Sequence, residues 1–243
     1  MKSDTRHAIP HFPTEGLQFL RSLKRNNRRE WFNERKQTYE ECVREPMHAI
    51  VEAIAPELDR FAPDIIASPK VSLFRIYRDT RFSKDKSPYK THVAASFPPK
   101  GMAKHQGAGL YFHIAPTEFL IGGGLYSPDP KDVPVVRGHI AEHFRQFQSI
   151  ISAPRFRKMF GEISGAQLMR VPQGYAKDHP AAHYLRFKQF LATRTLPVTA
   201  ATTGSFGTTV LETFRTLYPL IRFLNEPIHK AQQLRERRDQ LMR

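Results

Sequence analysis

Cysteine is nearly absent from this sequence, and so are long apolar runs. Cys42 is the only cysteine among 243 residues, which excludes an intrachain disulfide and a zinc site built from several cysteines. No stretch approaches the ~20 apolar residues that a membrane-spanning helix needs. The start, residues 1–16, has no apolar core of signal-peptide length. We therefore expect a cytoplasmic protein of a reducing compartment with no membrane partner.

Several catalytic and nucleotide-binding motifs are missing as well. The sequence contains no G-x-S-x-G elbow, no G-x-x-x-x-G-K-S/T phosphate loop and no G-x-G-x-x-G after a predicted strand, which disfavours the common hydrolase and nucleotide folds. Acidic residues are also scarce, with 23 Asp and Glu against 38 Lys and Arg, a formal net charge of +15. Such a basic protein attracts polyanions, so phosphate-bearing partners are favoured over other classes.

The apolar residues that are present predict one mixed fold. Apolar residues make up 40% of the chain, and their helical spacing predicts helices in the first quarter (residues 14–58), over 133–151 and over 209–224. Runs of β-branched and aromatic residues predict strands over 71–77, 92–97, 108–115 and 118–126, the last two joined as a hairpin through 115–117, with shorter strands near 168–171 and 187–191. The expected class is α+β, a mainly antiparallel central sheet covered by N-terminal and C-terminal helices. We expect an N-terminal extension over 1–13, a single domain over 14–228 and a basic tail over 229–243.

One basic run stands out between Lys70 and His92. It holds seven Lys and Arg side chains but only two acids, Asp79 and Asp85. Arg75 falls inside the predicted strand 71–77, between apolar neighbours, and is expected to be substantially buried. Because an unpaired guanidinium is costly to bury, something negative should lie beside it.

We interpret this run as a pocket for a phosphate-bearing ligand, a nucleotide or another phosphorylated small molecule. Guanidinium groups bind phosphate oxygens in bidentate fashion and lysines add point charges. Asp79 would orient the arginines, and Tyr89 would line the pocket. The candidate ligand-binding residues are Arg75, Arg78, Asp79, Arg81, Lys86, Tyr89 and Lys90.

Three other interpretations of the run stay open. The cations could form a structural salt-bridge network with distant acids such as Glu30, Glu34 or Glu52. Aromatic residues between the cations, Phe74, Tyr77, Phe82 and Tyr89, are also compatible with single-stranded nucleic-acid binding. If the protein is an enzyme, phosphoryl or phosphodiester chemistry is favoured, with Asp79 and His113 as candidate catalytic residues. No motif identifies a cofactor or an oligomeric state.

A separate motif, H-x-x-E-H, stands at His139, Glu142 and His143. On a helix this spacing places two imidazoles on one face, as in some zinc-dependent hydrolases. A third metal ligand would be needed, for example Glu162, Glu212 or Glu226. The alternative is a pair of solvated histidines on the polar face of an amphipathic helix.

The basic run also carries a family resemblance. It reads R-x-x-R-D-x-R-F followed by D-K-x-x-Y, at Arg75, Arg78, Asp79, Arg81, Phe82, Asp85, Lys86 and Tyr89. In this signature the chain resembles the domain of unknown function 2461 family, hypothetical proteins found in bacteria and some fungi. The resemblance includes the segments 26–32 and 171–175 and covers nearly the whole chain. The resemblance implies that the Arg and Asp run is the candidate functional site.

Overall fold

The structure is a computed structural model that describes residues 8–102 and 106–242. The predicted N-terminal extension and basic tail therefore lie partly outside the described residues. The chain forms two compact units, one from residues up to 97 with 111–121 and 195–212, the other from 98–110, 122–194 and the residues from 213 on. Because their segments alternate along the sequence, neither unit is one continuous stretch. The predicted single domain over 14–228 stays a prediction.

Four strands form one antiparallel sheet in the order β1-β2-β3-β4. They are β1 (Val93–Phe97), β2 (Gly109–Ile114), β3 (Glu118–Leu125) and β4 (Phe190–Pro197). Strands β2 and β3 are joined by the predicted hairpin, in which the Ala115 amide donates to the Glu118 carbonyl at 2.9 Å. The α+β class is confirmed.

Helices of the first unit account for most of the first 72 residues. They are α1 (Thr14–Arg25), α2 (Arg29–Glu34), α3 (Lys36–Tyr39), α4 (Glu45–Phe61) and α5 (Pro69–Ser72), with the π-helical turn η1 (Glu40–Arg44) between α3 and α4. The apolar stripe of α1 is buried, and the ring of Phe19 lies 5.6 to 6.2 Å from those of Trp31, Phe32 and Tyr39. The predicted helical first quarter is thus confirmed. The unit also holds the 3-10 turn η2 (Val198–Ala201) and the first residues of α10 (Phe206–Leu241).

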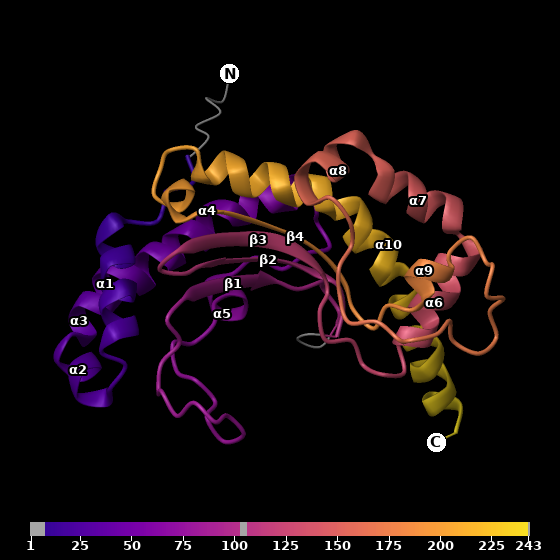
Figure 1. The fold of residues 1–243 in the computed structure, drawn as a ribbon, viewed down its shortest axis with the longest axis horizontal. Helices are drawn as coiled ribbons and strands as arrows, with labels where there is room; N and C mark the ends of the chain where they lie inside the picture. The colour runs from indigo at the N-terminus through magenta and orange to yellow at the C-terminus, as the bar shows by residue number, and fades with distance from the viewer. Residues whose placement is uncertain (1–7, 103–105, 243) are drawn as a thin grey trace. The chain divides into compact units, whose positions relative to one another are not determined.

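The segment from Leu73 to His92 differs from its prediction. We call it the arm (Figure 1), because it leaves α5, projects from the sheet and returns to β1. Leu73 forms an isolated bridge with Ala95, and Tyr77 forms one with Tyr89. The predicted strand over 71–77 is therefore wrong: its first residues belong to α5, which begins at Pro69, a residue whose fixed φ suits the first turn of a helix.

The second unit holds α6 (Val133–Glu142), α7 (Phe144–Ser152), α8 (Pro154–Phe160), α9 (Ala182–Leu185) and the rest of α10. The predicted helix over 133–151 is broken, because His143 leaves helical geometry, with φ −109° and ψ 35°. The strands predicted near 168–171 and 187–191 are reduced to isolated bridges and to the start of β4. None of the helices in the described part of the chain combines the length and the apolar character that crossing a membrane requires.

Candidate functional site

The root of the arm is fixed by apolar packing and by one amide. Tyr89 is 3% exposed, and its ring stacks on that of Phe32 with centroids 4.1 Å apart and planes 21° apart. The Asn27 side chain brackets the Tyr89 backbone: its Nδ2 donates to the Tyr89 carbonyl at 2.9 Å, and its Oδ1 accepts from the Tyr89 amide at 3.1 Å. Residues 62 positions apart in the sequence are thus held together at this point.

The tip of the arm, residues 79–87, is braced by its own polar groups. Asp79 accepts two hydrogen bonds from the Arg81 guanidinium, at 3.0 and 2.8 Å, and one from the Arg81 amide at 3.2 Å. Arg78 pairs with Asp85, and Lys86 donates to the Thr80 carbonyl at 3.0 Å. The tip therefore holds its shape largely through bonds within the arm.

Both carboxyl groups of this bracing titrate at unusually low pH. Hydrogen bonds from Arg81 lower the pKa of Asp79 from 3.8 to about 2. Hydrogen bonds from the Ser87 hydroxyl and from Arg78 hold the pKa of Asp85 well below its ordinary value. In each case donors to the carboxylate stabilise its charged form. Both groups are ionised at neutral pH, so each neutralises a cation of the basic run.

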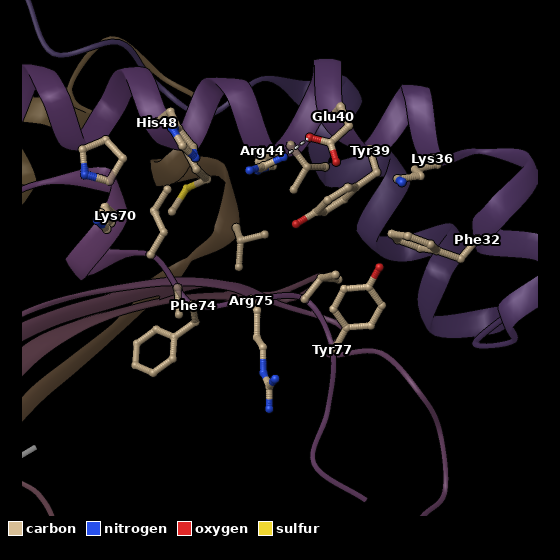
Figure 2. Close-up of a pocket in the computed structure, with 17 residues that line it drawn as sticks. Phe32, Lys36, Tyr39, Glu40, Arg44, His48, Lys70, Phe74, Arg75 and Tyr77 are labelled. Carbon is tan, nitrogen blue, oxygen red and sulfur yellow. Dashed lines mark hydrogen bonds and ion pairs between the residues drawn. The ribbon is translucent and has the colours of Figure 1, made fainter. Parts of the chain in front are cut away.

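Arg75 does not occupy the buried position predicted for it. Its side chain is exposed, and in Figure 2 it extends from the arm away from Arg44 and Glu40. The expectation failed because the arm backbone is irregular here, so the alternation of a regular strand does not apply. Lys90 donates to the Arg75 carbonyl at 2.8 Å and thereby ties the two sides of the arm together.

A first cavity, the arm cavity, lies between the arm and the start of α2. Its volume is about 600 Å³, and it is lined by Asn27, Arg28, Arg29, Glu30, Asn33, Tyr77, Arg78, Thr80, Lys86, Pro88 and Tyr89. Four of these side chains are cationic, and Glu30 is the one acid in the lining. Arg78 and Lys86 are already engaged within the arm. Arg28 and Arg29 are exposed, and no hydrogen bond or ion pair joins either guanidinium to another described residue.

A second cavity, the helix cavity, lies between the arm and the helical layer formed by α3, η1 and α4 (Figure 2). It measures about 500 Å³, and its apolar lining includes the buried side chains of Val43, Met47 and Ile76. Polar side chains surround this lining: Lys36, Tyr39, Glu40, Arg44, His48, Lys70, Arg75 and Tyr77. Arg44 is paired with Glu40 at 2.7 Å. Tyr77 lines both cavities.

His113 lies on β2 in a cluster of polar side chains. Its Nδ1 is 3.1 Å from the Tyr111 hydroxyl, and its Nε2 is 3.3 Å from Glu118 Oε1. The ring of His92 lies 5.2 Å away, and burial, together with the nearby His113 and Lys90, lowers the pKa of His92 from 6.5 to about 4. His113 lines neither cavity, so a catalytic role for it stays a prediction.

The H-x-x-E-H motif spans the end of α6. The rings of His139 and His143 are 4.5 Å apart, and Glu226, one of the expected third ligands, has Oε2 3.9 Å from His139 Nε2. Within residues 8–102 and 106–242, no group of three or more His, Cys, Asp or Glu side chains is arranged to hold a metal ion. A zinc-dependent hydrolase therefore stays a prediction without support from this geometry.

The seven candidate ligand residues divide among several places. The structure brings Arg78, Lys86 and Tyr89 to the arm cavity, pairs Asp79 with Arg81 at the tip, and leaves Arg75 on the rim of the helix cavity. Arg78 and Arg81 pair with Asp85 and Asp79 inside the arm, and not with the more distant acids that were expected. A purely structural Arg/Asp salt-bridge network therefore stays a prediction.

The predicted ligand residues did not include the cavity residues Asn27, Arg28 and Arg29. Periodicity could not assign them, because Arg29 begins a helix of only six residues, α2, and the other two precede it. The available signal was the family resemblance, which includes the segment 26–32. That segment and the basic run are the two sides of one cavity.

Fold and site together define an α+β protein in which a braced basic arm forms a cavity with the N-terminal helical segment. The family model described as "Conserved hypothetical protein (DUF2461)" matches residues 15–223. The chain therefore belongs to this family. A search of curated proteins finds no match.

Proposed function

We infer that this protein binds a phosphate-bearing ligand, a nucleotide or another phosphorylated small molecule, in the arm cavity. The observation that carries this proposal is the charge of the lining, in which four cationic side chains face one carboxylate. A volume of about 600 Å³ falls within the range of about 300–1,000 Å³ typical of small-molecule sites. The ligand class is the one predicted from the sequence, but Arg28 and Arg29 replace Arg75 and Arg81 as its main contacts.

The availability of the arginines supports this assignment. Lys86 is held by the uncharged Thr80 carbonyl and supplies a fixed positive charge, whereas the charge of Arg78 is neutralised by Asp85. Arg28 and Arg29 are exposed, and their guanidinium forks can bind phosphate oxygens in bidentate fashion. A fixed lysine on one side of the cavity and available guanidinium donors on the other suit an anionic group placed between them.

A pair of double variants tests the site. Arg28→Gln with Arg29→Gln removes two cavity charges, while Lys24→Gln with Arg25→Gln removes two exposed charges of α1 outside the lining. We expect the first to weaken pyrophosphate binding, measured by isothermal titration calorimetry, at least tenfold, because each charged hydrogen bond contributes about 1.5–3 kcal/mol. The second should change affinity less than about threefold, through the long-range field alone. Equal losses in both would contradict a defined site.

A second candidate, single-stranded nucleic acid, is favoured by one feature of the tip. Phe82 is 95% exposed, and the Arg81 guanidinium lies 5.7 Å from its ring centroid. An exposed ring beside cations can stack on a base while the cations contact the backbone. Two tests separate the candidates. Binding of an oligonucleotide should fall steeply between 50 and 200 mM salt as counterions are released. Phe82→Ala should weaken oligonucleotide binding, whereas pyrophosphate binding should not depend on Phe82.

A further inference from the structure

The two cavities meet at an aromatic partition. Tyr89 lines the arm cavity and Phe32 lines the helix cavity, and these two rings are stacked 4.1 Å apart. Tyr77, whose ring lies 5.6 Å from that of Tyr89, lines both cavities and is 51% exposed. Tyr77 is therefore the side chain that the linings of the two cavities have in common.

The two cavities differ in chemical character. The arm cavity is lined mostly by charged and amide side chains. The helix cavity has an apolar floor, because Val43, Met47 and Ile76 are buried and face it. The rim of the helix cavity is cationic too, with four Lys and Arg side chains and one carboxylate. Its distinguishing feature is therefore the apolar floor, which suits the uncharged part of a small molecule. The pair of cavities thus suits a ligand with an anionic end and an apolar body.

One polar group inside the helix cavity indicates which kind of apolar ligand body fits there. In Figure 2 the Tyr39 hydroxyl points toward the space between η1 and the arm. No hydrogen bond joins this hydroxyl to another of the residues that the structure describes. Burial, assisted by Glu40, raises the pKa of Tyr39 to about 12, so it is a neutral phenol that can both donate and accept. A ring with nitrogen or oxygen atoms would satisfy it, whereas an alkyl chain would not.

The backbone of the helix cavity is unusual at the same place. Glu40, Val43 and Arg44 belong to η1 and line the cavity. A π-helical turn departs from the i→i−4 hydrogen bonding of the α-helix. Such turns are rare, and many of those known lie at functional sites. The polar hydroxyl of Tyr39 and the side chains of this turn therefore converge on one side of the cavity.

From these observations we propose that the ligand is a nucleotide whose phosphate groups bind in the arm cavity and whose base lies in the helix cavity, with Tyr77 between them. The proposal rests on the proposed function and names its ligand class. The base contacts the apolar floor and forms a hydrogen bond with the Tyr39 hydroxyl. Arg28 and Arg29 hold the phosphates.

Calorimetry with matched probes tests the proposal. The probes are pyrophosphate, which has only the anionic part, the nucleoside diphosphates of the four common bases, and dodecyl phosphate, which carries an alkyl body. We expect at least one nucleoside diphosphate to bind more than tenfold more tightly than pyrophosphate. Tyr39→Phe, which removes a single hydroxyl, should weaken that nucleotide about threefold to tenfold and leave pyrophosphate unchanged. Tyr126→Phe, at an exposed tyrosine outside both cavities, serves as the control and should change neither.

The failures of the two proposals are distinguishable. If all four nucleoside diphosphates bind with the same affinity as pyrophosphate, the base contributes nothing to binding. The nucleotide assignment is then wrong, while phosphate binding stands. If dodecyl phosphate binds more tightly than all nucleotides and Tyr39→Phe does not change its affinity, the body of the ligand is an alkyl chain and not a base. If neither pyrophosphate nor any nucleotide binds, the proposed function falls as well.

Discussion

The root and the tip of the arm are held by different forces. At the root, Tyr89 is buried against Phe32 and its backbone is bracketed by Asn27. At the tip, exposed charges pair with one another, Asp79 with Arg81 and Asp85 with Arg78. Apolar burial stabilises a fold far more than exposed ion pairs do. The root should therefore matter for the stability of the protein, and the tip for the local shape of the arm.

The largest expected effect is at the root. Phe32 is 1% exposed and contacts the rings of Phe19, Tyr39 and Tyr89, so Phe32→Ala leaves a cavity and should lower the free energy of unfolding by about 3–5 kcal/mol. The matched control is Phe82→Ala at the tip, where the ring is 95% exposed and the expected change is within about 0.5 kcal/mol. Urea unfolding measures both. Similar losses for the two variants would remove the distinction between root and tip.

An intermediate effect is expected for Asn27→Ala. The variant leaves the amide and carbonyl of Tyr89 without their side-chain partners, and we expect a loss of about 2 kcal/mol. Hydrogen exchange at the Tyr89 amide should accelerate together with that of its neighbours in the arm. Asn33→Ala, an exposed change at the same cavity, is the control. If only Asn33→Ala accelerated this exchange, the bracket would not be what holds the root.

The smallest effect on global stability is expected from titrating the tip. Because the folded pKa of Asp79 is lowered from 3.8 to about 2, its bracing is complete above the ordinary value and is lost as the pH falls through about 2. A carbon-detected NMR titration of the Asp79 carboxyl should show this midpoint, and Arg81→Gln should move it back toward 3.8. A midpoint near 3.8 in the unmodified protein would mean that the tip is not braced in solution.

Local sequence patterns predicted the parts of the fold that depend on neighbours in sequence. The apolar stripe of α1 has helical spacing and is buried, and the hairpin between β2 and β3 closes through Ala115 and Glu118, three residues apart. In both cases the information lies within a few residues. The excess of cations in the basic run was also predictable from the sequence, because it requires only a count of Lys and Arg against Asp and Glu.

The candidate site depends on contacts that no local pattern contains. Arg75 was expected to be buried because its neighbours resembled a strand, yet the segment pairs only through isolated bridges and Arg75 is exposed. The bracket from Asn27 to Tyr89 joins residues 62 positions apart. Arg28 and Arg29 directly follow Asn27 and line the arm cavity, so their place in it followed from the structure.

The π-helical turn η1 makes the helix cavity sensitive to chain length. A π turn accommodates one residue more than the α-helix. Deleting a single residue from Glu40–Arg44 would therefore allow regular α-helix from α3 into α4 while Met47 and His48 keep their facing toward the cavity. Such a deletion would remove only the bulge, and with it the part of the cavity wall that η1 forms.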